Sequence, residues 1–331
     1  MTPGLGGAGE GRERRQAIGM LLVANVCWGL SFPLIKTVTA LNARLLPSAG
    51  GGCIVGLALA PRFLLGLLVL LAFPGRKTPG LRWLTAGEIR QGIRLGFFGG
   101  AGLLLQSDGL RFTAASTSAF LTQFYAIMIP VWLALRLRRA PPAAVWLACA
   151  LVLAGVALLG HFDWRQLRAG RGELETLLSS VFFMVQILML GSREYAACRT
   201  ARVTLVWFAV EAVLFGALAV ATAPSLRALG VPWTSPAWLG CTFLLASICT
   251  VGAFVIMARW QPKVSATEAG LIYCFEPIFG ALFALFLPAL FSRWSGISYP
   301  NETATLSLLV GGGLITVANA VVQFQPAAAS S

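Results

Sequence analysis

Charged residues are scarce in this chain. Only 11% of its 331 residues are Asp, Glu, Lys or Arg, whereas 57% are apolar, and the mean hydropathy is +0.80. A typical soluble domain carries about 25% charged residues. The composition therefore excludes an ordinary soluble protein and predicts a polytopic protein embedded in the lipid bilayer.

Histidine is nearly absent as well, since His161 is the single one. The seven cysteines show no paired CxxC spacing. A zinc site or a Ser/His/Asp triad is therefore hard to build. No P-loop lysine motif occurs, and Gly4, Gly6 and Gly9 fit GxGxxG only formally, because no strand precedes them. We expect no cofactor, no bound metal and no enzymatic activity.

The basic residues outnumber the acidic ones, and the formal net charge is +13. They form short clusters between apolar runs: Arg12, Arg14 and Arg15; Arg76 and Lys77; Arg136, Arg138 and Arg139; Arg193, Arg199 and Arg202. Such clusters are typical of cytoplasmic loops, so no nucleic-acid partner is expected. They predict both termini in the cytoplasm of a cell with the chain in its inner or plasma membrane. One loop does not follow this pattern, because Arg165, Arg168 and Arg171 fall on the side of the membrane opposite the cytoplasm.

Ten apolar segments approach or exceed the length needed to cross about 30 Å of hydrocarbon. They are residues 17–36, 54–73, 92–111, 115–135, 143–161, 173–191, 203–222, 237–258, 265–287 and 304–324. The connections are short, which leaves no room for a second soluble domain.

Glu276 lies in the middle of one such run, where a charged side chain costs about 2.5–3.5 kcal/mol. A similar pattern occurs 147 positions earlier in the chain. There Ser118, Ala119, Pro130, Ala134 and Leu135 align with Ser265, Ala266, Pro277, Ala281 and Leu282. This register aligns the uncharged Ile129 with Glu276. If segments 115–135 and 265–287 are equivalent, each repeat holds five segments, and the odd number inverts the second copy.

The expected organisation is accordingly a flexible cytoplasmic tail (1–16), a first repeat (17–161), a linker loop (162–172), a second repeat (173–324) and a C-terminal tail (325–331).

Three stretches share a pattern with a known family. Residues 27–36 read CWGLSFPLIK, residues 119–125 read AFLTQFY ahead of Pro130, and residues 266–282 run from ATEA to EPIFGAL. They resemble the helix-1 opening, the first-repeat segment and the second-repeat Glu-Pro signature of EamA-type transporters in the drug/metabolite transporter superfamily. The chain departs from the family at Arg136-Leu137-Arg138 and Phe286-Leu287-Pro288, where a Leu-Gly-Glu is common.

The resemblance implies an all-α membrane protein with ten transmembrane helices in two inverted five-helix EamA-like repeats. It implies a secondary transporter that exports a small metabolite, amino acid or drug-like solute by alternating access, with coupling to protons left open. Segments 17–36, 92–111, 115–135, 173–191, 237–258 and 265–287 would line the cavity. Segments 143–161 and 304–324 would lie at the periphery or at a homodimer contact.

Glu276 is the leading candidate for a proton pathway. Burial disfavours its charged form, so the carboxyl can take up a proton on one side of the membrane and release it on the other. A protonated carboxyl that only hydrogen-bonds across helices is the alternative. Pro130 and Pro277 are helix-break candidates, because each leaves a carbonyl, of Ala126 and of Tyr273, without its helical partner. These carbonyls either line a polar cavity or accompany simple kinks.

Further candidates for substrate contact lie on the same segments. Tyr273, three residues before Glu276, shares its helical face and can bond the carboxyl, stack on a substrate or pack. Gln123 and Tyr125 are polar groups only two positions apart, so we do not expect both to face the cavity equally. Trp28 and Ser31 share one face of the first segment, which packing explains as well as substrate contact does.

Other polar residues allow more than one role. Gln106 is a candidate interhelical hydrogen-bonder. Lys36 either extends to the membrane interface or faces an anionic substrate. Arg62 and Glu211 are charges within apolar segments, and each requires a partner, a cavity or an oligomer contact.

Gly92, Gly96 and Gly100 recur at every fourth position, which predicts a face where another helix approaches closely.

Two other functional classes compete with transport. An intramembrane enzyme needs a converging catalytic cluster, for which the chain offers one histidine and few deeply placed acids. A membrane sensor or structural partner would produce no solute flux. The charge of a substrate also stays open, because Lys36 or Arg62 suits anions, whereas Glu276 with Trp28 and Tyr273 suits cations.

Overall fold

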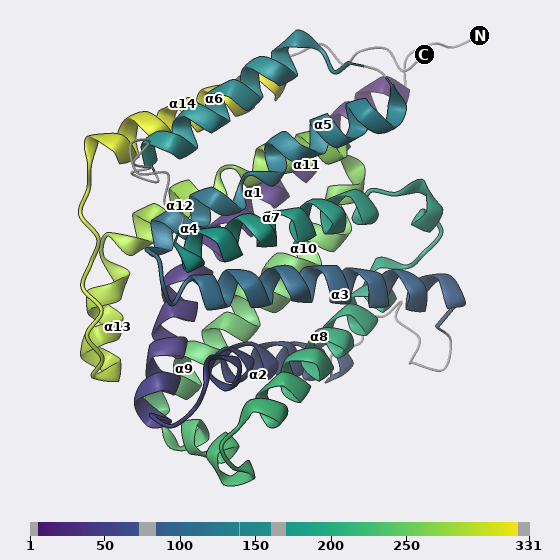
Figure 1. Ribbon diagram of the computed structural model, residues 1–331. Coiled ribbons are helices and arrows are strands. Elements are labelled where there is room, and N and C mark those ends of the chain that lie inside the picture. Colours follow the sequence, from purple (N-terminus) through teal and green to yellow (C-terminus); the bar gives the residue numbers. More distant parts are fainter. Residues whose placement is uncertain (1–5, 73–83, 139, 160–169, 324–331) are drawn as a thin grey trace.

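Helices build the described structure. The computed structural model describes residues 6–72, 84–138, 140–159 and 170–323, and these ranges contain no strand (Figure 1). Most of the predicted linker and all of the predicted C-terminal tail lie outside them. The α-helices are α1 (Gly6–Leu45), α2 (Gly51–Ala72), α3 (Ala86–Gly109), α4 (Ala115–Thr122), α5 (Tyr125–Leu137), α6 (Ala143–Leu159), α7 (Arg171–Leu190), α8 (Thr200–Thr222), α9 (Pro236–Leu244), α10 (Ala253–Trp260), α11 (Ala266–Tyr273), α12 (Glu276–Ala284), α13 (Leu287–Ser295) and α14 (Leu306–Gln323). Shorter helical segments are Arg193–Tyr195, Leu226–Thr234, Leu245–Gly252 and Gln261–Lys263.

Each predicted apolar segment coincides, within the described ranges, with one helix or with consecutive helices. By length and composition, six stretches in these ranges can cross a membrane. The helices α11 and α12 are followed by α13 after a bend of 55°, and these helices make a seventh span if they are counted as one. α3 is less apolar, since Glu88, Arg90 and Arg94 lie in its first three turns. α6 is short for a complete span.

α1 extends nine residues beyond the predicted end at residue 36. Polar residues after Lys36 find partners inside the bundle. Asn42 is fully buried, with its Nδ2 donating to the Ile54 carbonyl at 2.9 Å and its Oδ1 accepting from Trp238 Nε1 at 2.8 Å. Because tertiary contacts satisfy these groups, the helix continues to Leu45.

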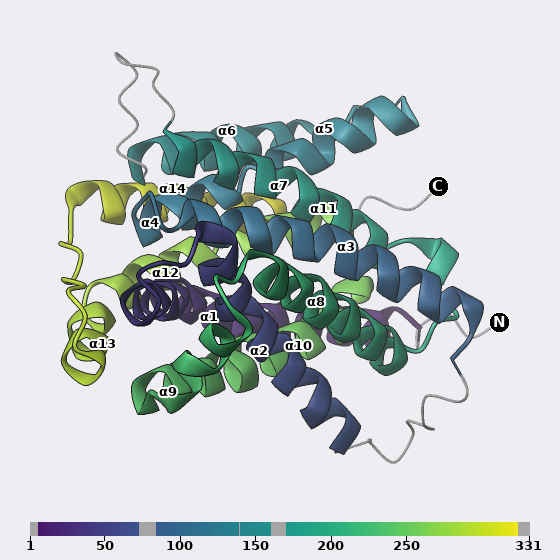
Figure 2. The same cartoon turned by 60° about the horizontal axis from the view of Figure 1, so that its bottom comes forward.

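The helices pack early parts of the chain against late parts. α2 lies on α8, α3 contacts both α7 and α8, and α1 contacts α10 and α12. α4 contacts α12 and α7, while α5 contacts α11 and α7. α6 and α14 pack on each other along one edge of the bundle (Figures 1 and 2). That edge is the peripheral place expected for segments 143–161 and 304–324.

The glycine face of α3 is a close contact with α8. A Cβ on Gly92 would lie 2.5 Å from Val206 Cβ, and one on Gly96 would lie 2.7 Å from Val210 Cβ and 3.0 Å from the Trp207 carbonyl. Such distances leave no space for a methyl group on α3. The bilayer supplies no hydrophobic force between helices, so this close van der Waals contact stabilises the α3–α8 pair.

Replacing Gly96 with Ala should destabilise the protein, because the added methyl forces α3 and α8 apart. We expect a loss of about 1–3 kcal/mol, typical of overpacking, measured as a lower midpoint of thermal unfolding in detergent. Gly216→Ala on α8 is the matched control, since nothing lies within 4 Å of its Cβ position. Equal midpoints for the two variants would contradict the proposed tight contact.

Candidate functional site

Two interrupted helices meet near the centre of the bundle. The first interruption separates α4 from α5 at Gln123 and Phe124, and the second separates α11 from α12 at Cys274 and Phe275. At both places the backbone makes tight i to i−3 bonds, such as Gln123 N to Phe120 O and Cys274 N to Leu271 O. This is 3₁₀ geometry, which frequently occurs where a helix changes direction.

The interruptions precede the two prolines instead of coinciding with them. Pro130 lies inside α5, whereas Pro277 is the second residue of α12, where a missing N–H costs the helix no internal bond. The carbonyl of Ala126 accepts a weak bond from Cys149 Sγ at 3.9 Å. The two prolines are thus not at equivalent points of their helices.

Helix boundaries give a different register for the internal repeat. Ala115 and Ala266 begin α4 and α11, and Tyr125 and Glu276 begin α5 and α12, so both pairs are 151 positions apart. The sequence register of 147 aligns Ile129 with Glu276, whereas the spacing of the helix starts aligns Tyr125 with it. The two registers differ by one helical turn, which preserves the apolar face of a helix, so the sequence pattern does not distinguish them.

Glu276 sits at the interruption, 8% exposed. Its Oε2 accepts a hydrogen bond from Gln123 Nε2, at the other interruption, over 3.4 Å. α1 closes the third side, because a Cβ on Gly29 would lie 2.6 Å from Phe279 Cβ and 2.8 Å from Gly280 N of α12. The absence of a side chain at Gly29 therefore allows α1 to reach the helix that carries Glu276.

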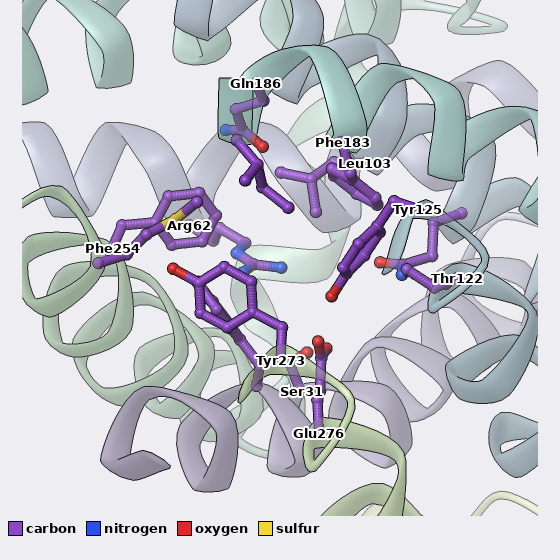
Figure 3. Close-up of a pocket in the computed structure, with 14 residues that line it drawn as sticks. Ser31, Arg62, Leu103, Thr122, Tyr125, Phe183, Gln186, Phe254, Tyr273 and Glu276 are labelled. Carbon is purple, nitrogen blue, oxygen red and sulfur yellow. Dashed lines mark hydrogen bonds between the residues drawn. The ribbon is translucent and has the colours of Figure 1, made fainter. Parts of the chain in front are cut away.

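An internal cavity of about 60 Å³ opens beside Glu276, with room for a few water molecules (Figure 3). All six segments expected to line a cavity contribute to it, and α2 contributes as well. Its lining residues are Trp28, Ser31, Arg62, Leu103, Gln106, Thr122, Tyr125, Phe183, Gln186, Ile187, Phe254, Met257, Tyr273 and Glu276.

The structure brings most of the predicted site residues together. Six of them line this cavity: Trp28, Ser31, Gln106, Tyr125, Tyr273 and Glu276. Gln123 is fully buried and reaches the site through Glu276. The helix interruption explains why both Gln123 and Tyr125 take part, since the two residues no longer follow one continuous helix.

Lys36 lies away from the cavity. Its Nζ donates to the Thr113 carbonyl at 2.8 Å and stands 5.6 Å from the centre of the Tyr299 ring. In this structure Lys36 therefore links α1 to the connection between α3 and α4 and does not face the predicted site.

Tyr273 and Trp28 form an aromatic wall of the cavity. The Tyr273 hydroxyl donates to Gln261 Oε1 at 3.0 Å and not to Glu276, and Gln261 Nε2 donates onward to the Ile187 carbonyl at 2.9 Å. Trp28 meets the Tyr273 ring edge to face, with centroids 5.4 Å apart. The remaining hydrogen bond across the cavity joins Gln106 Nε2 to Thr122 Oγ1 at 2.9 Å, as expected for an interhelical hydrogen-bonder.

Arg62 is the second charged residue of the lining, and the sequence left its role open between a partner, a cavity and an oligomer contact. Its Nε donates to Thr250 Oγ1 at 2.6 Å, and its Nη2 lies 3.4 Å from the Cys249 carbonyl. The signal was present, since Arg62 is a charge in an apolar segment, as Glu276 is. Gln186 carried a weaker polar signal, and the apolar lining residues carried none.

Metal binding finds no support in the same region. In the part of the chain that the structure describes, no group of three or more His, Cys, Asp or Glu side chains lies close enough to hold a metal ion. The cavity chemistry rests on one carboxylate, one guanidinium, amides, hydroxyls and aromatic rings.

Tyr273→Phe should lower the stability of the protein, because it leaves the buried Gln261 Oε1 without its donor. An unsatisfied buried acceptor costs about 1–3 kcal/mol, which a thermal unfolding midpoint would report. Tyr195→Phe is the comparison, because the Arg94 side chain that donates to its hydroxyl is 45% exposed, so water can replace the lost acceptor. A loss no larger than that of Tyr195→Phe would show that the Gln261 bond is unimportant.

Comparisons with known proteins show a similarity to one transporter family. Residues 15–160 match the model of the EamA-like transporter family. A protein of Archaeoglobus fulgidus described as an uncharacterized transporter is 24% identical over 286 residues, which are 84% of this chain and 80% of that protein. A solved crystal structure of a protein shares the fold, with a TM-score of 0.66 and 20% identity, over 93% of this chain and 96% of that one. The chain is therefore a multi-pass membrane protein whose residues 15–160 are similar to the EamA-like transporter family, as its motifs suggested.

Proposed function

We propose that this transporter moves a small solute by alternating access and couples that movement to protons through Glu276. The observation that carries the proposal is the position of this carboxylate, which is buried, lines the cavity and begins α12. Within the described residues it accepts one hydrogen bond, the long one from Gln123. A carboxylate held so loosely is free to exchange a proton or a ligand.

Two opposing influences act on the charge of Glu276. Burial away from water disfavours the ionised form. The unpaired N–H groups at the start of α12 favour a negative charge, as at any helix N-terminus. Among the described residues, Glu276 has no direct ion pair that would fix its charge. Small changes in its hydration between two access states can therefore decide whether its carboxyl binds a proton.

The packing pattern supports two five-helix repeats, 17–161 and 173–324, related by a twofold axis. Exchanging the halves maps the α3–α7 contact onto that of α10 with α1, and the α4–α7 contact onto that of α11 with α1. The α2–α8 and α6–α14 contacts map onto themselves. This is the pattern of an inverted repeat, in which one half rocks against the other around a midplane site.

Ion pairs between the halves occur at both ends of the bundle. At one end Arg14 of α1 pairs with Glu268 of α11, and Glu13 pairs with Lys263. At the other end Arg171 of α7 pairs with Asp108 of α3, and Thr113 donates to Glu173 at 2.8 Å. Alternating access requires the contacts at one end to open while those at the other persist, so these groups are the proposed gates.

We further infer an exporter in the cell membrane with both termini in the cytoplasm and ten spans. Most basic residues then face the cytoplasm, in agreement with the positive-inside rule. A homodimer would use the exposed apolar faces of α6 and α14, which carry Leu147, Leu153, Leu306 and Leu309.

Glu276→Gln should abolish the response of transport to a pH gradient, because the amide cannot bind and release a proton. The measurement uses liposomes that contain the purified protein and a filtered small-molecule extract of cells. Solute release after an imposed pH gradient is followed by mass spectrometry, against empty liposomes. Glu194→Gln is the matched control, since Glu194 is an exposed residue whose nearest cations, Arg90 and Arg94, lie 3.8 and 3.6 Å away.

Gradient-driven release that persists in Glu276→Gln would remove this carboxylate from the coupling step. Wild-type liposomes that release no more solute than empty ones would reject transport altogether and favour a sensor or structural role.

The ten-span topology predicts which loops are accessible from outside the cell. Single cysteines at Thr303 and at Glu194, both exposed positions, should lie on opposite sides of the membrane. A membrane-impermeant maleimide added to intact cells should label Thr303→Cys but not Glu194→Cys, over the background of the native cysteines. Labelling of Glu194→Cys alone would invert the assigned orientation, and equal labelling would refute the span count.

A further inference from the structure

Helix α13 carries an apolar face that the rest of the described chain leaves partly uncovered. We propose that α13 lies in the plane of the membrane surface, at the boundary between lipid headgroups and acyl chains, and that lipid is the partner of this face. The inference is independent of the proposed transport, because it concerns a lipid contact at one end of the bundle and no step of solute movement.

α13 runs across the bundle and not along it. The chain bends by 55° between α11–α12 and α13. Figure 1 shows α13 at the end of the bundle where α3 ends, in a direction that crosses that of α3. Its nine residues extend about 14 Å, less than half of the roughly 30 Å of hydrocarbon that a span must cross. Neither its length nor its direction suits a spanning segment.

Both ends of α13 are capped, so it is a helix in its own right. At the start, the backbone N–H of Ala289 donates to Asn301 Oδ1 at 2.7 Å. At the other end Gly296 adopts the left-handed conformation, with φ 67°, and donates its N–H to the Ser292 carbonyl at 2.8 Å. Arg44 of α1 donates to the carbonyl of Gly296, where the helix dipole favours a cation. α13 is therefore fixed to the end of α1.

Large apolar side chains form an exposed stripe on α13. Phe286, Leu290 and Trp294 are four positions apart and between 49% and 59% exposed. Leu290 and Trp294 share one face of the helix, since four residues make about one turn, and Phe286 directly precedes the helix. Pro288 and Phe291, on a neighbouring face, are buried against the bundle. One apolar face thus packs on protein while the next one does not.

Polar groups border the stripe. Arg293 is exposed and lies three residues after Leu290, at the edge of the apolar face. Ser292 lies further round the helix, and its hydroxyl donates to the Tyr299 carbonyl at 2.7 Å. A helix with Trp, Phe and Leu on one side and a cation beside them is typical of segments that lie on a membrane. The Arg293 stem can cover apolar surface while its guanidinium reaches a lipid phosphate.

The stripe continues a surface that faces lipid. Leu282 of α12 is exposed one turn before Phe286, and the ring of Phe283 meets that of Phe286 edge to face, with centroids 6.5 Å apart. α12 belongs to the predicted spanning segment 265–287, so its exposed apolar side chains contact acyl chains. The apolar surface therefore passes from α12 onto α13, which is the continuity expected if both meet the same leaflet.

A second tryptophan marks the same level of the membrane. Trp233, in the segment Leu226–Thr234 just before α9, is exposed, and its ring meets that of Trp238 with centroids 5.0 Å apart. Trp294 lies on α9 as well, since a side chain on Gly240 would overlap its ring. Tryptophans gather where a membrane protein meets the headgroups. Two of them around one helix place α13 at the membrane surface.

Spin labels at single cysteines test this position in the full-length protein, reconstituted into vesicles of phosphatidylcholine and phosphatidylglycerol. Leu290→Cys reports on the stripe. Val213→Cys, 71% exposed near the middle of α8, is the lipid control, and Ser298→Cys, in an exposed loop, is the water control. Collisions of each label with oxygen report lipid, and collisions with a nickel chelate report water. The signal of labelled wild type is subtracted to remove the seven native cysteines.

We expect the Leu290→Cys label about 5–10 Å below the phosphates, the depth of an interfacial helix. It should be shallower than the label at Val213 and should collide with oxygen, relative to the nickel chelate, more often than the label at Ser298. Arg293→Cys is a matched variant on the same helix, and its label should lie nearer to water than that at Leu290. All four positions are exposed, so the substitutions leave the buried core intact.

Three other outcomes would each overturn the inference. A Leu290→Cys label as accessible to the nickel chelate as that at Ser298 would place α13 in water, and one as deep as that at Val213 would make α13 part of a span. Protection from both reagents would show that protein, such as a second copy of the chain, covers the stripe. An Arg293→Cys label deeper than that at Leu290 would likewise reject the assigned face. Loss or persistence of proton-coupled release has no bearing on these results.

Discussion

A charged side chain at the centre of a bilayer costs about 2.5–3.5 kcal/mol on insertion scales, and every unsatisfied polar group adds to that cost. Three charged residues of the predicted apolar segments, Arg62, Glu211 and Glu276, are nevertheless buried among the described helices. Thr250 and Gln123, which bond Arg62 and Glu276, come from other segments, whereas Trp207, which bonds Glu211, lies one turn earlier on α8. The helices must stay in register for these partners to meet, so the polar interior constrains the whole packing arrangement.

Close helix approach makes that register possible. Apolar side chains gain little from leaving lipid for a helix interface, so contacts depend on van der Waals fit. Gly96 brings α3 against α8, and Gly29 brings α1 against α12. The second contact sets the distance between the helix that carries Trp28 and Ser31 and the helix that begins at Glu276. Small residues thus determine the geometry of the cavity although they contribute no chemistry to it.

The interrupted helices give the two halves different roles. Both α5 and α12 begin at the cavity, but the first begins with Tyr125 and the second with Glu276. The two helix starts therefore present a neutral hydroxyl on one side and a carboxylate on the other. Proton coupling through Glu276, as proposed above, would place the titrating group in the second of these helices.

The sequence by itself determined the membrane class and the approximate helical segments, and it singled out Glu276 as a candidate, because composition and an isolated acid in an apolar run are local signals. It also indicated a resemblance to a transporter family, through motifs in three segments. It did not distinguish a spacing of 147 from one of 151 positions between the two interrupted segments, because a shift of one turn leaves an apolar face unchanged. The partner of Tyr273, the position of Lys36 and the entry of Arg62 into the cavity depend on contacts between residues far apart in the chain. Only the tertiary structure decided these, since the direction of a side chain around a helix bundle follows from the neighbours that pack against it.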